Sequence, residues 1–314
     1  MNNLKEFHIK NGMLAEISLK TTESYFEYFK DGEYDSELFN SFTSQDNTKW
    51  ADPIVIFDVG GFMGITAMLF AKLTSNPNSK IVIFEPNPYN HERILENLSL
   101  NTELSQKIEV INTALSDKIG TIDMFLSSNI DNGYSSTSRI EGAKSTISNH
   151  NLPSDFSNVT VNTETLDSFV EKSGLKPDII KVDIEGAEHL FLLGAAGTIK
   201  KYKPVIYMEL HSQYCALHCT QQLLKMGYQF DILKEESDKR LLIKAFYCDA
   251  NEQTVMTLSL ARQNYNIEAM NRRISDVENK ITQQNLENLK KIKSMLSDIG
   301  IHGILRKIMK RIKK

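Results

Sequence analysis

The sequence predicts an α/β fold, a doubly wound sheet with helices on both faces. Apolar runs rich in β-branched residues alternate with runs of helical character over residues 51–250, as expected for parallel strands joined by crossover helices. The run at 54–57 is followed by an acid and three glycines within 58–64, and then by a helical run at 65–71. Open sheets bind ligands at the carboxyl ends of their strands, so this turn marks the predicted binding site.

The spacing of this glycine turn narrows the class of ligand. A dinucleotide site uses G-x-G-x-x-G, whereas this turn reads D-x-G-x-x-x-G, with Asp58 ahead of Gly60. A carboxylate at this position repels a pyrophosphate but suits an ammonium group. The pattern therefore favours a cofactor with an amino-acid portion, such as S-adenosylmethionine, and the alternative is a tight turn that binds nothing.

The elements on either side of the turn follow in order. Aromatic residues at helical spacing over 24–29 and 36–42 predict two short helices, and residues 1–50 form an N-terminal helical cap over the sheet or a substrate entrance. A second strand at 80–84 ends in Glu85, which is placed to accept hydrogen bonds from ribose hydroxyls. The alternative for Glu85 is a solvated acid at a strand end. A helix at 89–100 comes next.

The middle of the chain carries a long polar segment. A third strand at 108–112 leads into Ser116-Asp117, and residues 120–126 predict one arm of a β-hairpin. Residues 127–157 are rich in serine and asparagine, and a loop of this length is either functional or disordered. Two interpretations stay open for it, a substrate lid and a flexible insertion.

The last part of the sheet is again acidic at its strand ends. After a short strand at 159–161, Thr165 is a plausible N-cap for a helix. A buried strand beginning near Pro177 runs into Asp183 and Glu185, and the next one ends at Glu209 and His211. A helix at 216–226 then precedes two closing antiparallel strands, 228–233 and 241–247.

Composition and charge limit the classes of function. The chain has 314 residues and a net charge of −4, yet residues 255–314 carry 13 Lys and Arg against 5 Asp and Glu, which leaves an acidic body. An acidic body argues against a nucleic-acid substrate. The absence of an apolar run of about 18 residues predicts no transmembrane helix, and the polar N-terminus does not resemble a signal peptide. Three cysteines fit a reducing cytoplasm.

The basic C-terminal part has two patterns. Apolar residues over 267–281 step by three and four, so residues 251–299 predict a long helix or a short coiled coil that forms a homo-oligomer through 267–299. The alternative is a helix packed on the body. Residues 300–314 alternate apolar and basic faces, which predicts peripheral contact with an anionic membrane at its inner face. The alternative there is a soluble basic tail.

Four motifs together resemble one known family. They are Asp58 to Gly64, Phe84 to Pro88, Ala114 to Asp117 and, most specifically, the run from Asp178 to Glu188. In this order they look like the FkbM-family methyltransferases over about residues 50–250. One departure is Phe62, where the family more often has asparagine. The resemblance implies a Rossmann-like, seven-stranded class I methyltransferase sheet and S-adenosylmethionine-dependent O-methylation, often of sugars in glycans, polysaccharides or natural products.

The resemblance also implies roles for individual residues. The methionine end of the cofactor would lie against Asp58, Gly60, Gly61 and Gly64. Its ribose would bind Glu85, and its adenine would lie near Ser116 and Asp117. The transfer site would be faced by Asp183, Glu185 and Glu209, with Asp183 also beside the cofactor. These same three acids are a candidate magnesium site, because magnesium prefers carboxylates.

Transfer to a sugar hydroxyl needs a general base, because this nucleophile is poor at neutral pH. Asp183 is the first candidate, and His211 is the second because its ordinary pKa suits the role. Glu209 is the third. The alternatives are that Asp183 only positions the cofactor and that His211 is a satisfied structural histidine. A non-catalytic, cofactor-binding scaffold on the same fold is the competing function.

Overall fold

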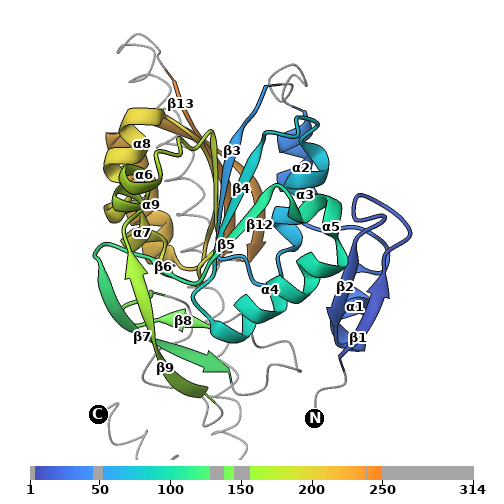
Figure 1. The fold of residues 1–314 in the computed structure, drawn as a ribbon. Helices are drawn as coiled ribbons and strands as arrows, with labels where there is room; N and C mark the ends of the chain where they lie inside the picture. Colours follow the sequence, from blue (N-terminus) through green and yellow to red (C-terminus); the bar gives the residue numbers. More distant parts are fainter. Residues whose placement is uncertain (1–3, 45–51, 128–137, 145–155, 238–239, 249–314) are drawn as a thin grey trace, which may run out of the picture. The chain divides into compact units, whose positions relative to one another are not determined.

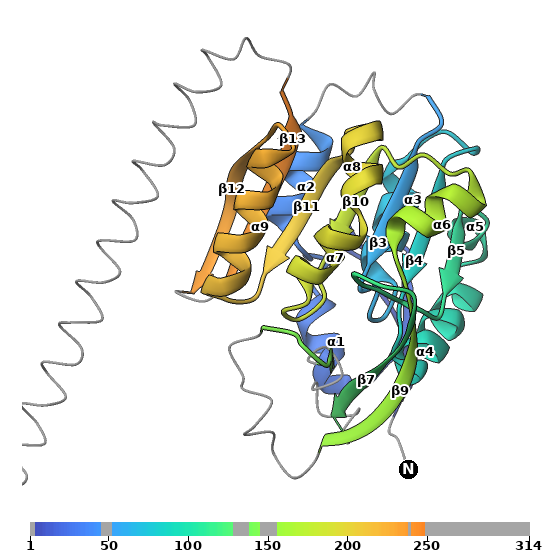
Figure 2. The same ribbon diagram turned by 90° about the vertical axis from the view of Figure 1, so that its left-hand side faces the viewer.

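The computed structural model describes residues 4–44, 52–127, 138–144, 156–237 and 240–248, and residues 1–249 form one compact unit. Its centre is a seven-stranded sheet in the order β12-β13-β11-β10-β3-β4-β5 (Figure 2). The strands are β3 (Val55–Val59), β4 (Lys80–Phe84), β5 (Ile108–Ile111), β10 (Ile179–Val182), β11 (Val205–Leu210), β12 (Tyr228–Ser237) and β13 (Arg240–Tyr247). From β11 through β10, β3 and β4 to β5, each strand is parallel to its neighbour, whereas β13 runs antiparallel to both β11 and β12.

Helices cover both faces of this sheet (Figure 1). One face carries α2 (Ser36–Thr43), α3 (Ile65–Leu73), α4 (Pro88–Leu100) and α5 (Thr102–Ser105), and the other carries α6 (Leu166–Ser173), α7 (Glu188–Gly194), α8 (Ala196–Tyr202) and α9 (Gln213–Lys225). Successive residues of β3 enter the two cores: Ile56 packs on one side and Phe57 on the other, both fully buried. The helices on both faces confirm the predicted doubly wound sheet. A strand buried on both faces has a continuous apolar sequence, which is why the sequence could predict this arrangement.

Chain order reverses between β3 and β10, because β4 and β5 lie on one side of β3 and β10 and β11 on the other. Such a reversal opens a crevice at the carboxyl ends of the two central strands. The switch point therefore lies between the glycine turn after β3 and the acids after β10.

The N-terminal part contains more than the two predicted helices. The helices are α1 (Glu23–Phe29) and α2, as expected, but a hairpin of β1 (Lys5–His8) and β2 (Ser18–Thr21) precedes them. Helix α4 holds this hairpin, since the side-chain oxygens of Asn97 and Asn101 accept the N–H groups of Lys20 (2.7 Å) and Ser18 (2.9 Å). The sequence did not predict this short hairpin, because β1 is largely exposed and therefore lacks the apolar pattern of a buried strand.

A second sheet lies beyond the carboxyl ends of the main strands (Figure 1). Its order is β6-β9-β7-β8, from β6 (Ala114–Leu115), β7 (Gly120–Ser127), β8 (Arg139–Ile140) and β9 (Phe156–Glu164). The predicted hairpin arm is confirmed as β7, which pairs with β9. The strand predicted at 159–161 is longer than expected, and β8 falls inside the segment predicted as a lid or flexible insertion.

The predicted helix cap at Thr165 and the two predicted closing strands are confirmed. The Thr165 side chain caps α6 by accepting the N–H of Ser168 (3.1 Å), and the two closing strands pair antiparallel. Within the part of the chain that the structure describes, no helix is long and apolar enough to cross a membrane. The helix or coiled coil predicted for 251–299 and the amphipathic tail at 300–314 lie outside the described residues.

Candidate active site

A cavity of about 720 Å³ opens at the carboxyl edge of the main sheet. Of the residues predicted from sequence, six line it: Gly60, Gly61, Glu85, Asp183, Glu185 and Glu209. Five others are not among its lining residues: Asp58, Gly64, Ser116, Asp117 and His211. Ala114 and Leu115 reach the cavity wall in place of Ser116 and Asp117, because the Ser116 N–H is bonded to the Glu164 carbonyl (2.9 Å) within the second sheet.

The glycine turn closes against the neighbouring strand ends. Gly60 has φ +89°, its N–H donates to the Phe84 carbonyl (2.9 Å), and a Cβ at this position would lie 1.9 Å from the Asp183 carbonyl oxygen. A Cβ on Gly61 would lie 2.1 Å from Ile83. Only glycine fits such close approaches, and the turn thereby brings the ends of β3, β4 and β10 together around the cavity.

Glu85 is fixed by backbone groups. Its carboxylate accepts the N–H of Phe62 (2.8 Å) and the N–H of Asn87 (2.9 Å), and the residue is 4% exposed. Burial raises the pKa of Glu85 to about 7, although these hydrogen bonds oppose the shift. Glu85 therefore sits at the edge of ionisation near neutral pH, at the end of the second parallel strand as the sequence predicted.

Asp58 has a different partner from the one expected. It is fully buried, and its carboxylate lies 3.4 Å from the Nζ of Lys181, its register partner on β10. The same Nζ donates to the Gly60 carbonyl (3.1 Å) and to Asp183 (3.4 Å). The ammonium group that Asp58 meets is thus that of Lys181 and not that of a ligand. A lysine inside a buried strand is almost always paired with an opposite charge, so the sequence could have indicated a buried partner for Lys181, but this residue was not predicted as part of the site.

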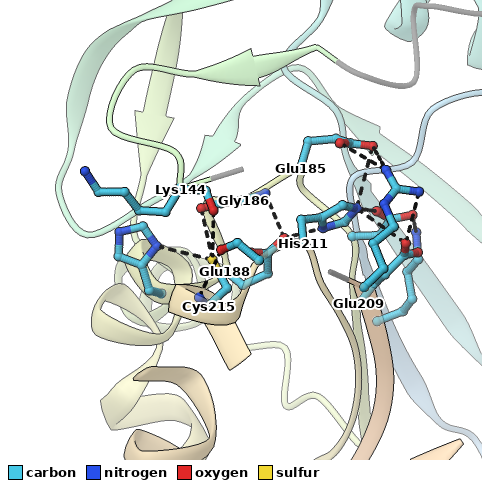
Figure 3. A network of polar contacts seen from close by, with 12 residues as sticks. Lys144, Glu185, Gly186, Glu188, Glu209, His211 and Cys215 are labelled. Carbon is cyan, nitrogen blue, oxygen red and sulfur yellow. Dashed lines mark hydrogen bonds and ion pairs between the residues drawn. The ribbon is translucent and has the colours of Figure 1, made fainter. Parts of the chain in front are cut away.

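His211 lies at the centre of a group of carboxylates (Figure 3). Its Nδ1 is 2.7 Å from Glu188, and its Nε2 is 3.4 to 3.6 Å from oxygens of Asp183, Glu185 and Glu209. Burial disfavours the charged ring, but the hydrogen bond and charge of Glu188 outweigh it and raise the pKa of His211 to about 10. An imidazolium cannot accept a proton, so this geometry argues against His211 as the general base at neutral pH.

Two arginines complete the site, and neither was predicted. Arg240 at the start of β13 contacts both Glu185 oxygens (3.3 and 3.4 Å) and lies 3.5 Å from Glu209. Arg139 on β8 is 2% exposed and lines the same cavity. Both are distant in sequence from the acidic motifs, so no local spacing pointed to them.

The charges around the acids argue against a magnesium ion. Single ligand atoms of Asp183, Glu209 and His211 lie within 4.8 Å of one another. However, the Nζ of Lys181 lies 3.4 Å from Asp183, so a side-chain cation already faces this carboxylate. Arg240 likewise lies 3.3 Å from Glu185 and 3.5 Å from Glu209. Lysine and arginine side chains therefore already face all three acids of the predicted set, Asp183, Glu185 and Glu209, which fits magnesium poorly.

Asp183 remains the best-placed base. Its side chain is 31% exposed and faces the cavity. Burial favours the neutral acid, but the charges of Lys181 and His211 outweigh it and lower the pKa of Asp183. It is therefore an ionised carboxylate at the switch point, able to accept a proton from a group bound in the cavity.

The fold and site define a class I, Rossmann-like methyltransferase architecture, with one antiparallel strand inserted in a parallel sheet and acids at the switch point. The methyltransferase FkbM domain matches residues 58–230. This match spans more than half of the chain, which therefore belongs to the FkbM methyltransferase family.

Solved structures with similar folds include other methyltransferases. The FkbM methyltransferase from Methylobacillus flagellatus KT is 19% identical with a TM-score of 0.48, over 70% of this chain and 50% of that one. Our chain thus spans about half the length of that protein. TYW2 from M. jannaschii, solved with AdoMet, is 10% identical with a TM-score of 0.38, over 79% and 88%. No curated protein matches the chain.

Proposed function

We propose that this methyltransferase uses S-adenosylmethionine to methylate a hydroxyl group of a saccharide, in a glycan, a polysaccharide or a glycosylated natural product. The observation that carries the proposal is the placing of Glu85 and Asp183 in one cavity, on either side of the glycine turn. One acid suits cofactor binding, and the other suits proton removal.

The residues present fit this cofactor. Glu85 lines the cavity with two of its roughly four acceptor positions taken by backbone N–H groups and another by the side chain of Asn90, which leaves room to accept a ribose hydroxyl. Gly60 and Gly61 let the turn pack against Asp183 and Ile83, so that its backbone lines the cavity. When bound, S-adenosylmethionine supplies a methyl group on a sulfonium centre, a good electrophile that needs alignment with the acceptor oxygen.

The chain supplies the base and its support. A hydroxyl loses its proton as its oxygen forms the new bond to carbon, and Asp183 takes that proton. Lys181 holds Asp183 ionised from one side and His211 from the other. When the cofactor is bound, the methyl group would pass to the acceptor oxygen as its bond to sulfur breaks and leaves a neutral thioether; Asp183 would hold the hydroxyl proton and then release it to solvent.

Methyl transfer from labelled S-adenosylmethionine to polysaccharide and lipid-linked saccharide fractions tests this proposal. We expect label in a saccharide with the full chain and a large loss with Asp183→Asn. Label only in protein, or only in small molecules that carry no sugar, would contradict the saccharide acceptor. Cofactor binding with no transfer to any fraction would support the alternative, a non-catalytic scaffold.

A further inference from the structure

Three aromatic residues form a continuous face at the cavity, which we name the aromatic shelf: Tyr25 and Tyr28 of α1, and Phe62 after β3. The ring centroids of Tyr25 and Tyr28 lie 6.2 Å apart, and those of Tyr25 and Phe62 lie 5.7 Å apart. Tyr28 is 79% exposed. A contiguous apolar patch rimmed by polar residues, rather than a single exposed ring, is what marks a ligand-binding groove.

Helix α1 holds the shelf in place from its other side. The Thr22 side chain caps the helix by accepting the N–H of Tyr25 (3.3 Å), and Phe26 stacks on Phe7 of the hairpin at 4.1 Å. Phe29 is buried in the core. The helix is thus anchored by Phe26 on the hairpin and by the buried Phe29, whose ring also reaches the cavity wall, while Tyr25 and Tyr28 line the cavity.

Phe62 contributes its ring at a cost in backbone conformation. Its φ is +51°, in the left-handed region that asparagine tolerates and that a bulky residue rarely adopts. This conformation is strained in an ordinary residue, and such strain gathers at ligand sites. The backbone N–H of Phe62 is what binds Glu85, so that contact does not require the ring. The ring instead extends the aromatic shelf.

The same cavity offers polar groups of the opposite chemistry. Arg139, Arg240, Glu185 and Glu209 line it with planar guanidinium and carboxylate groups. A pyranose ring presents C–H groups on one face and hydroxyls around its edge, so it matches an aromatic surface combined with planar hydrogen-bonding groups.

We propose that the aromatic shelf is the acceptor subsite, on which the apolar face of a pyranose ring stacks while the charged groups hold its hydroxyls. This inference rests on the proposed function, because it assumes a saccharide acceptor. It assigns to Tyr28 and Phe62 the role of selecting the acceptor, separately from the cofactor contacts made by Glu85.

Saturation-transfer NMR with methyl hexopyranosides and saturating S-adenosylhomocysteine tests the subsite on the full chain. We expect signal on ring C–H protons of at least one hexopyranoside, weakened by about three- to tenfold in Tyr28→Ala and retained in Tyr28→Phe. Phe62→Asn relieves the backbone strain and removes the ring, so it should also weaken the signal. Tyr89→Ala is the matched control, because Tyr89 is 52% exposed on α4 and is not among the cavity's lining residues.

The outcomes separate the two proposals. If the unaltered chain binds a hexopyranoside and both Tyr28→Ala and Phe62→Asn bind it equally well, the shelf is not the acceptor subsite, although the saccharide acceptor stands. If the unaltered chain binds S-adenosylhomocysteine but no saccharide at all, the proposed acceptor class is wrong. A tenfold loss of S-adenosylhomocysteine affinity in Tyr28→Ala would overturn the inference by showing that the ring covers the cofactor.

Discussion

The two ends of the cavity hold their carboxylates in different ways. At the end proposed to bind the cofactor's ribose, which we call the ribose end, backbone N–H groups from the turns that follow β3 and β4 hold Glu85. At the end proposed for methyl transfer, which we call the transfer end, the side-chain cations Lys181, His211 and Arg240 hold the acids Asp183, Glu185 and Glu209. The ribose end is therefore part of the fold itself, whereas the transfer end depends on side chains brought from several strands.

The difference has consequences for titration. At Glu85 burial dominates over the backbone hydrogen bonds and the charge of Lys181, and it raises the pKa to about 7. At Asp183 the charges of Lys181 and His211 outweigh burial and lower the pKa, whereas burial raises the pKa of its neighbour Glu185 to about 6. Two carboxylates in one cavity are thus set to different protonation states, which is how a site assigns binding to one acid and proton transfer to another.

The largest effect should come from the base at the transfer end. Asp183→Asn should lower turnover by roughly 10²–10⁴-fold, as for loss of a general base, while affinity for S-adenosylhomocysteine stays within a few-fold. Parallel turnover and calorimetric measurements check this. Wild-type turnover in Asp183→Asn would move the search for the base to Glu209.

Removing the buried partner of His211 should damage stability more than any surface change. Glu188 is fully buried at 2.7 Å from His211, and breaking a buried ion pair costs about 3–5 kcal/mol. Glu188→Ala should therefore lower the free energy of unfolding in urea by that amount. The control is Glu27→Ala, which removes an exposed ion pair with Lys30 and should change the free energy of unfolding far less, because solvent screens such pairs. Similar losses in both variants would refute the account of the transfer end.

His211 also predicts how stability responds to alkaline pH. Its pKa is raised from 6.5 to about 10 in the folded protein, so the stability it contributes is fully present below about pH 6.5 and is lost as pH rises through about 10. Unfolding of His211→Gln in urea should show a flatter pH dependence over this window. An identical slope in both proteins would show that His211 is not held as a cation.

The ribose end should make cofactor binding depend on pH. Ribose hydroxyls donate to the ionised carboxylate, and Glu85 has a pKa of about 7 without ligand, so affinity for S-adenosylhomocysteine should rise about tenfold from pH 6 to pH 8. Without ligand the sign is opposite: the contribution of Glu85 to stability is lost as pH rises from about 4.5 to about 7. Calorimetry on Glu85→Gln should give a weaker affinity with little pH dependence, and an unchanged pH profile would contradict this role.

The smallest effect on catalysis should come from the tail, because none of the residues proposed above for cofactor binding or proton transfer belongs to it. We propose that residues 300–314 bind an anionic membrane surface, where each basic residue contributes about 1 kcal/mol. A chain ending at Asp298 should keep its turnover on a soluble acceptor but lose salt-sensitive sedimentation with anionic vesicles. Equal sedimentation of the full and shortened chains would refute membrane binding by the tail.

The same contrast explains what could be predicted from the sequence. Glu85 and the glycine turn were found because one strand and its own turn position them, and local patterns report such neighbours. Arg240 and Arg139 could not be found in this way. They reach the cavity only because β13 pairs with β11 and because β8 pairs within the second sheet. Asp58 was located correctly but given the wrong partner, because strand register places Lys181 beside it and register is not visible in either segment alone.

Titration of the full chain with S-adenosylhomocysteine in a calorimeter tests the central claim most directly. We predict one binding site per chain at pH 8, with affinity reduced in Glu85→Gln and unchanged within a few-fold in Asp183→Asn. Absence of binding to the folded protein, or equal binding by Glu85→Gln, would contradict the assignment of this cavity to the cofactor.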